Sequence, residues 1–254
     1  MSKTSWLLSS TALIGIAGGT AAAAGDAPAV SEFNARFEAR AATENEIDSY
    51  AAVGSFTVPV GHSFGFQVDG FLGTLDGEFA GAAATHLFWR DPNVGLLGIY
   101  GEVGDAEADG GGTVGRVAVE GELYLGRVTF TGLVGSQFGD LGEGFFSKES
   151  VSFYATDDLR LYAAHRYLPD DVGHSGSLGA EWLTPLAGNS LSLYGEGRLG
   201  EDENWGASGG IRLYFGPQKS LIERQRQDDP PDHFDLFMQA VSAGVAAFAD
   251  PILE

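Results

Sequence analysis

From residue 30 to residue 216 the chain alternates between apolar and polar residues with a period of two. This is the period of a β-strand with one apolar face, and about ten residues is the length at which a tilted strand crosses a bilayer. The alternation predicts twelve such strands, at 30–41, 47–59, 62–74, 78–90, 94–104, 113–124, 127–137, 148–156, 159–168, 174–184, 190–200 and 205–216.

The two faces of these segments differ in the same way along the chain. In 113–124, Arg116, Glu120 and Glu122 share one face, whereas Val117 and Val119 share the other. A soluble β-sandwich also alternates, but its core must be filled tightly by bulky residues. The apolar face here mixes large residues with many glycines and alanines. Fluid lipid tolerates such a surface, so the pattern favours a transmembrane barrel over a sandwich.

The connections between the segments point to the same fold. Those at 59–61, 91–93, 125–126, 157–158 and 185–189 are short, and several of the alternate ones are expected to be longer. Short periplasmic turns and longer outer loops are typical of outer-membrane barrels. The expected outer loops are acidic and contain Glu44, Glu46, Asp48, Asp105, Glu107, Asp109, Asp140, Glu143, Asp170, Asp171, Glu201, Asp202 and Glu203.

We therefore predict an all-β protein in the outer membrane of a Gram-negative bacterium, surrounded by outer-membrane lipid. The predicted fold is a transmembrane antiparallel up-and-down β-barrel of about 12 strands with a C-terminal periplasmic helical tail. An even number of strands places both chain ends on the periplasmic side.

Composition and the first residues set further limits. The 254 residues include 14 Lys+Arg and 35 Asp+Glu, a formal net charge of -21, which argues against nucleic acid as a partner because nucleic-acid binding needs a basic surface. Residues 1–24 combine Lys3, a short apolar stretch and an A-x-A type cleavage site, the features of a secretory signal peptide. The predicted organisation is a signal peptide at 1–24, the barrel at 25–216 and the tail at 217–254.

Aromatic residues occur near the ends of predicted strands. Trp89 and Phe215 lie near periplasmic ends and Trp205 near an outer end, positions that fit the aromatic girdle of an outer-membrane barrel. After Phe215 the chain leaves the membrane at Gly216-Pro217, so the residues that follow are free to be charged.

Four stretches resemble a porin-like family of Gram-negative outer-membrane proteins. They are VGHSFGFQVDG (60–70), HLFWRDPNVGLLGIYGE (86–102), VEGELYLGRVTFTG (119–132) and GGIRLYFGPQKSLIERQRQDDPP (209–231). The resemblance covers the chain from residue 25 to about Pro231 and implies the fold and the location. These stretches carry no known chemistry, so the resemblance implies no particular substrate. In better-known barrels the last strand usually ends the protein, whereas here a tail follows it.

The polar face of the predicted strands carries arginines and carboxylates together. We expect these groups to pair across neighbouring strands, because a buried isolated charge is costly. Two interpretations stay open: a pore for passive diffusion of small hydrophilic solutes, and a non-conducting structural or envelope-interaction barrel whose lumen is filled by paired charges. The residues expected to line the lumen are Arg36, Glu38, Arg40, Asp69, Glu78, His86, Glu102, Arg116, Glu120, Glu122, Arg160, Tyr162, Arg166, Glu181, Tyr194, Glu196, Arg198 and Arg212.

Five tyrosines are expected to point inward in the periplasmic half of the barrel. Such residues either form a constriction or fill volume and hydrogen-bond to the arginines. They are Tyr124, Tyr154, Tyr162, Tyr194 and Tyr214.

Other chemistry has weaker signals in the sequence. Divalent cations are candidate partners of the acidic loops, because hard cations take several carboxylate oxygens, but no loop has a calcium-binding spacing. Asp170, Asp171 and His174, with His165 nearby, are the only candidates for a surface hydrolase, and their spacing matches no catalytic motif. We expect no enzyme and no cofactor.

The tail contains a second kind of pattern. In DHFDLFMQAVSAGVAAF (232–248), apolar residues recur at spacings of three and four, which predicts an amphipathic helix with Asp232 as its N-cap. A lid over the periplasmic mouth, a helix packed against the barrel and a helix that binds membrane or a partner all fit this pattern, and the sequence does not identify a partner.

Overall fold

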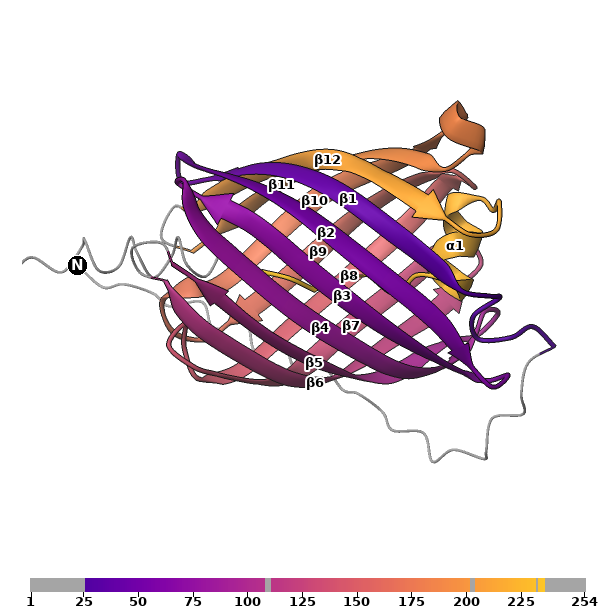
Figure 1. Ribbon diagram of the computed structural model, residues 1–254, viewed down its shortest axis with the longest axis horizontal. Helices are drawn as coiled ribbons and strands as arrows, with labels where there is room; N and C mark the ends of the chain where they lie inside the picture. The colour runs from indigo at the N-terminus through magenta and orange to yellow at the C-terminus, as the bar shows by residue number, and fades with distance from the viewer. Residues whose placement is uncertain (1–25, 108–110, 202–203, 232, 236–254) are drawn as a thin grey trace, which may run out of the picture.

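The computed structural model describes residues 26–107, 111–201, 204–231 and 233–235. Its strands form one closed antiparallel barrel in which each strand pairs with the next and β12 closes against β1 (Figure 1). The strands are β1 (Asn34–Glu44), β2 (Ile47–Val60), β3 (Phe64–Leu75), β4 (Glu78–Asp91), β5 (Gly95–Ala106), β6 (Gly112–Leu125), β7 (Val128–Phe138), β8 (Gly144–Thr156), β9 (Leu159–Leu168), β10 (Gly173–Thr184), β11 (Leu191–Gly200) and β12 (Trp205–Phe215).

The predicted twelve-stranded barrel is thus confirmed. The strand boundaries follow the alternation closely, since every predicted segment overlaps one observed strand. The expected signal peptide lies outside the described residues. No helix among the described residues is long and apolar enough to cross a membrane.

The connection between β1 and β2 differs from the prediction, because it is a tight turn and not a longer loop. The β3–β4 connection, which was not predicted to be long, has the same form. Asn45 and Glu46 join β1 to β2 with φ of 49° and 68°, and Asp76 and Gly77 join β3 to β4 with φ of 50° and 87°. Two successive residues with positive φ make the turn whose twist matches that of a β-hairpin. The ladder therefore continues further than the acidic composition suggested, so Glu44 and Asp48 belong to strands.

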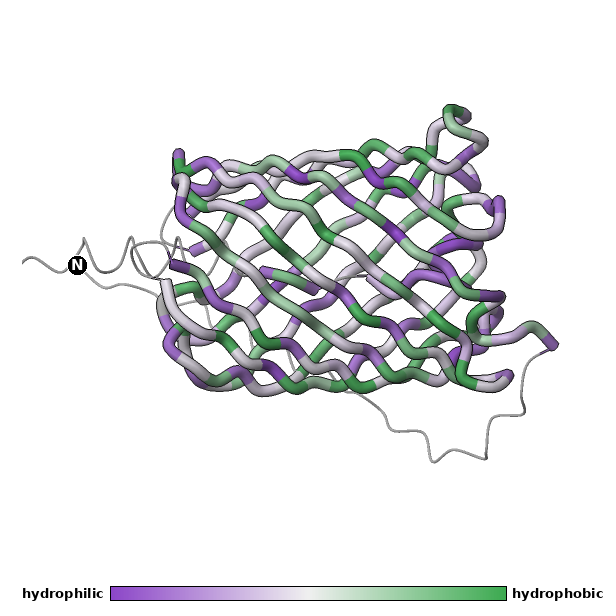
Figure 2. Tube along the Cα trace, in the orientation of Figure 1, coloured by the Kyte–Doolittle hydropathy of each residue, from purple (hydrophilic) through white to green (hydrophobic). Residues whose placement is uncertain are grey.

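Apolar and polar residues alternate along the strands (Figure 2), and the apolar side chains make the outer surface of the barrel an apolar belt. Large apolar side chains on this surface are exposed, among them Leu72, Leu97, Ile99 and Val119. At the outward glycines Gly54 and Gly70, which face each other across β2 and β3, a Cβ atom would meet nothing within 4 Å. A sandwich core would have filled this space, whereas lipid fills it without any side chain.

Part of the lumen is filled by apolar side chains, which the sequence analysis did not predict. Val53, Phe71 and Leu75 belong to one buried cluster with Leu141 and Val172, which come from the β7–β8 and β9–β10 connections. Phe234 of the tail joins the same cluster, and its ring centroid lies 5.6 Å from that of Phe71. The interior is therefore mixed, with an apolar plug beside charged walls.

The tail begins with a short helix at the end of the barrel where β1 starts and β12 stops, which is the end predicted to be periplasmic. This helix, α1 (Leu221–Gln227), was not predicted, although Ser220 and Glu223 form the reciprocal hydrogen bonds of a capping box at its start. Beyond α1 the chain turns into the barrel (Figure 1). Of the amphipathic helix predicted at 232–248, only 233–235 are described, and they lie in the lumen without helical structure.

Candidate functional site in the barrel lumen

The lumen contains nearly all the side chains that were expected to line it. Seventeen of the eighteen are buried or half-buried, and they occupy alternate positions of their strands. Glu78 differs, because it is the first residue of β4 and is exposed at the outer rim. The inward set is Arg36, Glu38, Arg40, Asp69, His86, Glu102, Arg116, Glu120, Glu122, Arg160, Tyr162, Arg166, Glu181, Tyr194, Glu196, Arg198 and Arg212.

Glu38 of β1 is the centre of one charged group. Its Oε1 accepts hydrogen bonds from Arg40 Nε and Tyr194 OH, each at 2.7 Å, and its Oε2 accepts one from Arg212 Nε at 2.6 Å. The guanidinium of Arg212 also lies over the ring of Tyr194, 4.1 Å from its centroid. Groups on β1, β11 and β12 thus stabilise the negative charge of the fully buried Glu38 carboxylate. Such partners offset the free-energy cost of burying a charge.

Glu181 of β10 is the centre of a second group. Arg212 Nη1 and Arg160 Nη2 lie 2.7 Å and 3.1 Å from its Oε2. Tyr214 OH and Ser192 Oγ each donate to its Oε1 at 2.8 Å. Arg212 therefore joins the groups around Glu38 and Glu181 into one network across the barrel wall.

A third group lies on the opposite wall, on β3, β4 and β6. His86 Nε2 lies 2.9 Å from Asp69 Oδ2, and His86 Nδ1 lies 2.8 Å from Glu120 Oε2. On β5 and β6, Arg116 Nη1 forms an ion pair with Glu102 Oε2 at 2.8 Å. The sequence predicted paired charges in the lumen, but not which groups pair.

The helix α1 lies across the mouth of the barrel at the end predicted to be periplasmic, and it contacts three of the connections there. Arg226 donates to the main-chain oxygens of Gly126 and Val128 between β6 and β7. Leu221 N donates to Asp158 Oδ1 in the β8–β9 turn, and Arg224 donates to Asn189 O between β10 and β11. A lid at this mouth was one expectation for the tail, and α1 lies in that place. Most of the helix predicted at 232–248 lies outside the described residues.

Three of the inward tyrosines hold this lid in place. The Arg226 guanidinium lies 5.0 Å from the ring centroid of Tyr124 and 5.6 Å from that of Tyr154, and the Arg224 guanidinium lies 5.0 Å from that of Tyr214. Cation–π contacts of this kind are favourable when the cation is desolvated. These tyrosines therefore bind the tail and do not line an open constriction.

After α1, residues 228–231 and 233–235 lie inside the lumen and bind its walls. Asp228 Oδ1 accepts a hydrogen bond from Ser31 Oγ at 2.6 Å, and Pro230 O accepts one from Gln67 Nε2 at 3.2 Å. Lys148 of β8 contacts both His233 O and the carboxylate of Asp235. The sequence analysis missed Lys148 and this segment, although the even position of Lys148 in β8 would have marked it as inward-facing.

Two carboxyl groups of the tail, those of Glu223 and Asp229, have shifted pKa values. Hydrogen bonds from the Ser220 side chain and backbone lower the pKa of Glu223, which favours the charged form in the capping box. Burial raises the pKa of Asp229 to about 6, and the neighbouring Asp228 carboxylate adds to this, while Arg36, Arg224 and Arg90 oppose it.

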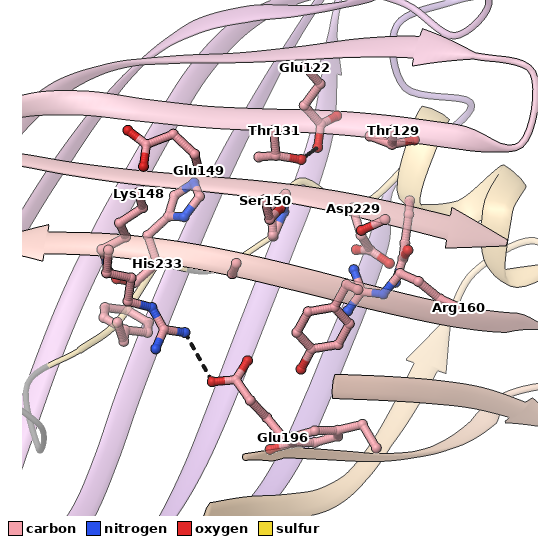
Figure 3. A pocket seen from close by; sticks show the side chains of 18 of the residues that line it. Glu122, Thr129, Thr131, Lys148, Glu149, Ser150, Arg160, Glu196, Asp229 and His233 are labelled. Carbon is pink, nitrogen blue, oxygen red and sulfur yellow. Dashed lines mark hydrogen bonds and ion pairs between the residues drawn. The ribbon is translucent and has the colours of Figure 1, made fainter. Parts of the chain in front are cut away.

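A cavity of about 190 Å³ remains beside the tail (Figure 3). Its walls come from β1, β6, β7, β8, β9, β11 and β12, and its tail side includes Asp229, His233 and Asp235. A smaller cavity of about 80 Å³ shares Arg40, Arg166 and Glu196 with it. The lumen thus has a part that is filled by apolar side chains and a hollow part with mostly polar and charged walls.

The other predicted positions lie at the surface. Trp89 is half-buried near the end of β4, while Trp205 and Phe215 are exposed at the two ends of β12. His165 and His174 are exposed, with His165 Nε2 lying 3.0 Å from His174 Nδ1 and His165 Nδ1 lying 2.8 Å from Glu149 Oε2. Asp170 instead binds the main-chain N of Glu143, so it is not part of this chain of contacts.

Cation binding at the acidic loops stays a prediction, because Asp109, Asp202 and Glu203 of these loops lie outside the described residues. In the part of the chain that the structure describes, three potential metal ligands come together only at His86, Glu120 and His233, in the lumen.

Comparisons with known proteins identify the fold. No protein-family model matches the chain, and no curated protein matches its sequence. Among solved structures, KdgM porin matches with a TM-score of 0.58 and 8% identity over 71% of this chain and 99% of its own. The Omp33 outer-membrane protein of Acinetobacter baumannii gives 0.50 and 8%, over 72% and 99% of the two chains.

The Salmonella typhi outer-membrane phospholipase dimer with bound calcium gives a TM-score of 0.51 and 10% identity, over 73% of this chain and 91% of its own. At such identities the likeness concerns the fold. The chain has the fold of the Gram-negative outer-membrane β-barrels, porins among them, which confirms the sequence prediction at that level. Because one of these barrels is an enzyme, the absence of catalysis stays a prediction.

Proposed function

We propose that this barrel is a porin-like channel for passive diffusion of small hydrophilic solutes, with its own tail as a gate. The observation that carries the proposal is the polar cavity of about 190 Å³ beside the tail. A barrel that used its lumen only as a core would be filled on all sides, as proteins pack their interiors. Here part of the lumen is filled by apolar side chains, and part, bordered mainly by polar and charged side chains, is hollow.

The hollow part of the lumen presents charges of both signs to a solute. Arg40, Arg160 and Arg212 border the cavity, and so do five carboxylates, Glu122, Glu149, Glu196, Asp229 and Asp235. Facing basic and acidic groups of this kind suit hydrophilic solutes with charged or hydroxyl groups, which the field of the walls orients. KdgM porin has been solved in complex with disordered oligogalacturonate, a carboxylated sugar chain. Arginine and tyrosine side chains suit solutes of that class.

The tail controls this path because it is anchored at both ends of its described course. α1 closes part of the periplasmic mouth, and Asp235 is held by Lys148 and Arg166. In this proposal the lumen conducts when the tail loosens from these anchors.

The test is single-channel conductance of the refolded chain without residues 1–24. Since the natural chain has no cysteine, Ser31→Cys with Asp228→Cys places a single disulfide between two short side chains that already touch. We expect the oxidised form to be closed, and the reduced form and a chain ending at Gly216 to conduct. The single variant Ser31→Cys is the matched control and should not respond to reductant.

A second candidate function, a non-conducting structural barrel, is favoured by the apolar cluster and the ion pairs that the tail completes. Silence of the reduced, the truncated and the unmodified forms, all shown to be folded, would support it and contradict the channel.

A further inference from the structure

We propose that His86, Glu120 and His233 form a transition-metal site that fastens the tail to the barrel wall, with Zn²⁺ as the best-fitting ion. One ligand atom from each of the three residues lies within 4.8 Å of the others. Glu120 Oε2 lies 2.8 Å from His86 Nδ1 and 3.6 Å from His233 Nε2. The ligands come from β4, β6 and the tail, so a bound ion would join segments that are distant in the sequence.

The donor set suits zinc. Two imidazole nitrogens and one carboxylate oxygen are ligands that Zn²⁺ takes in four-coordinate sites, with the fourth position left for water. Calcium and magnesium prefer oxygen ligands throughout, so the two histidines argue against them. Bringing the three donor atoms onto one ion requires movements of about an ångström, because protein bonds to zinc are about 2.0–2.2 Å long.

The surroundings of His86 are those of a metal ligand. Metal-binding histidines usually donate their second ring N–H to a carboxylate, which fixes the tautomer. Asp69 Oδ2 is in that position, 2.9 Å from His86 Nε2, so Nδ1 is left to face Glu120 and the tail. Asp69 is itself held by Gln67 Nε2, which donates to both carboxylate oxygens at 2.9 Å and 3.1 Å.

The site is enclosed, and one of its ligands has unused bonding capacity. His86 is fully buried, and the ring of Tyr100 packs on His86 and His233 with centroids 4.9 Å and 5.3 Å apart. Glu120 Oε1 is buried and has no hydrogen-bond partner among the described residues. A buried carboxylate oxygen without a partner calls for an explanation such as an ion. At Gly98 a Cβ would approach this oxygen to 2.6 Å, so glycine leaves room for it.

The same residues also fit a metal-free alternative, in which His86 carries both ring protons and bridges Asp69 and Glu120. The metal site predicts that zinc binds and that its affinity depends on the tail residue His233. The metal-free alternative predicts no such dependence. This test reads binding and not conductance, so its result is independent of whether the barrel conducts.

The experiment uses the chelator-stripped chain without residues 1–24, refolded in detergent. His165→Gln with His174→Gln serves as the parent, because that exposed pair, 3.0 Å apart, would bind zinc adventitiously. Zinc is titrated against a chromophoric chelator. We expect one tight site in the parent, an affinity at least about 100-fold lower in His233→Gln, and one about 10- to 100-fold lower in Asp69→Asn.

Asp235→Asn is the matched control, since it alters a tail anchor two residues away that is not a ligand. It should keep the site. X-ray absorption of the zinc-loaded parent checks the ligands directly and does not depend on the folding of any variant. Two imidazoles with oxygen are expected. A shell of oxygens only, or an affinity unchanged in folded His233→Gln, would overturn the proposal.

Discussion

Arg212 and Glu38 form an ion pair across the seam at which the barrel closes. They face each other in the register of β12 and β1, and Arg212 Nε lies 2.6 Å from Glu38 Oε2. The first and last strands of the barrel are thus joined by main-chain hydrogen bonds and also by a buried charge pair at the middle of the seam.

Glu38→Gln is expected to destabilise the barrel by about 3 kcal/mol. The substitution removes the carboxylate that Arg40 and Arg212 share, while Arg212 keeps its contact with Glu181. Breaking a buried pair costs more than the pair contributes. Urea unfolding of the refolded barrel in lipid vesicles measures the change. Glu149→Gln, which breaks an exposed contact with His165, is the control and should cost less than about 1 kcal/mol. Equal destabilisation by Glu38→Gln and Glu149→Gln would mean that the Glu38–Arg212 pair stabilises the barrel no more than an exposed contact does.

Val119→Arg is expected to destabilise the barrel by about 2–4 kcal/mol, because Val119 lies in the middle of β6 on the lipid-facing surface. Leu125→Arg is the matched control on the same strand. Leu125 is the last residue of β6 and is similarly exposed, and an arginine near the interface should cost only about 0–1 kcal/mol. The same unfolding assay compares the two. No difference between them would contradict the assignment of the membrane-facing surface.

Arg226→Ala is expected to loosen α1 from the periplasmic mouth. The variant loses the hydrogen bonds to Gly126 O and Val128 O, each about 1.5–3 kcal/mol for a charged donor. Trypsin should therefore cleave after Lys219 and Arg224 at least about tenfold faster, as followed by mass spectrometry. Arg127→Ala, which removes an exposed arginine paired with Asp157, should leave the rate unchanged. Cleavage as slow as in the unmodified chain would show that other contacts hold the lid.

Arg160→Gln is expected to shift the ion selectivity of the conducting form toward cations. Arg160 borders the cavity and pairs with Glu181, so its loss leaves a carboxylate to face passing ions. The reversal potential in a salt gradient reports this shift. Arg127→Gln, at a turn outside the lumen, is the control. An unchanged reversal potential in Arg160→Gln would place the ion path elsewhere.

Docking of the tail is expected to weaken as the pH rises. Burial raises the pKa of Asp229 to about 6 from an ordinary value of 3.8, so the docked tail favours the protonated carboxyl. The stability from this group is fully present below about pH 4 and is lost as the pH rises through about 6. Between pH 5 and pH 7 the tail should become about tenfold easier to cleave, which corresponds to roughly 1.4 kcal/mol. Each cleavage rate is divided by the cleavage rate of the unfolded chain at the same pH, so that the pH dependence of the protease itself cancels.

Asp229→Asn should remove this dependence, because an amide does not titrate. Arg36, Arg90 and Arg224 face Asp229 and remain charged throughout this range, and Asp228 is the other nearby carboxylate. A pH dependence that persists in Asp229→Asn would assign the effect to another group.

The sequence by itself determined the barrel and the two sides of its wall. In β6, the alternation of Val117 and Val119 with Arg116 and Glu120 is enough to distinguish a lipid-facing side from a lumen-facing one. The period of a strand is a local property, and one face of every strand must be apolar in lipid. For the same reason the inward arginines and carboxylates could be named in advance.

Only the tertiary structure decided what the lumen contains. The segment DDPP has no strand or helix period, and the helix period that begins at Asp232 does not say what the helix contacts. Nothing local therefore predicts that Pro230 binds Gln67 or that His233 approaches Glu120. Likewise, the partner of each charge depends on the register between strands and on distances across the barrel. These contacts join residues far apart in the chain, and a local pattern carries no information about them.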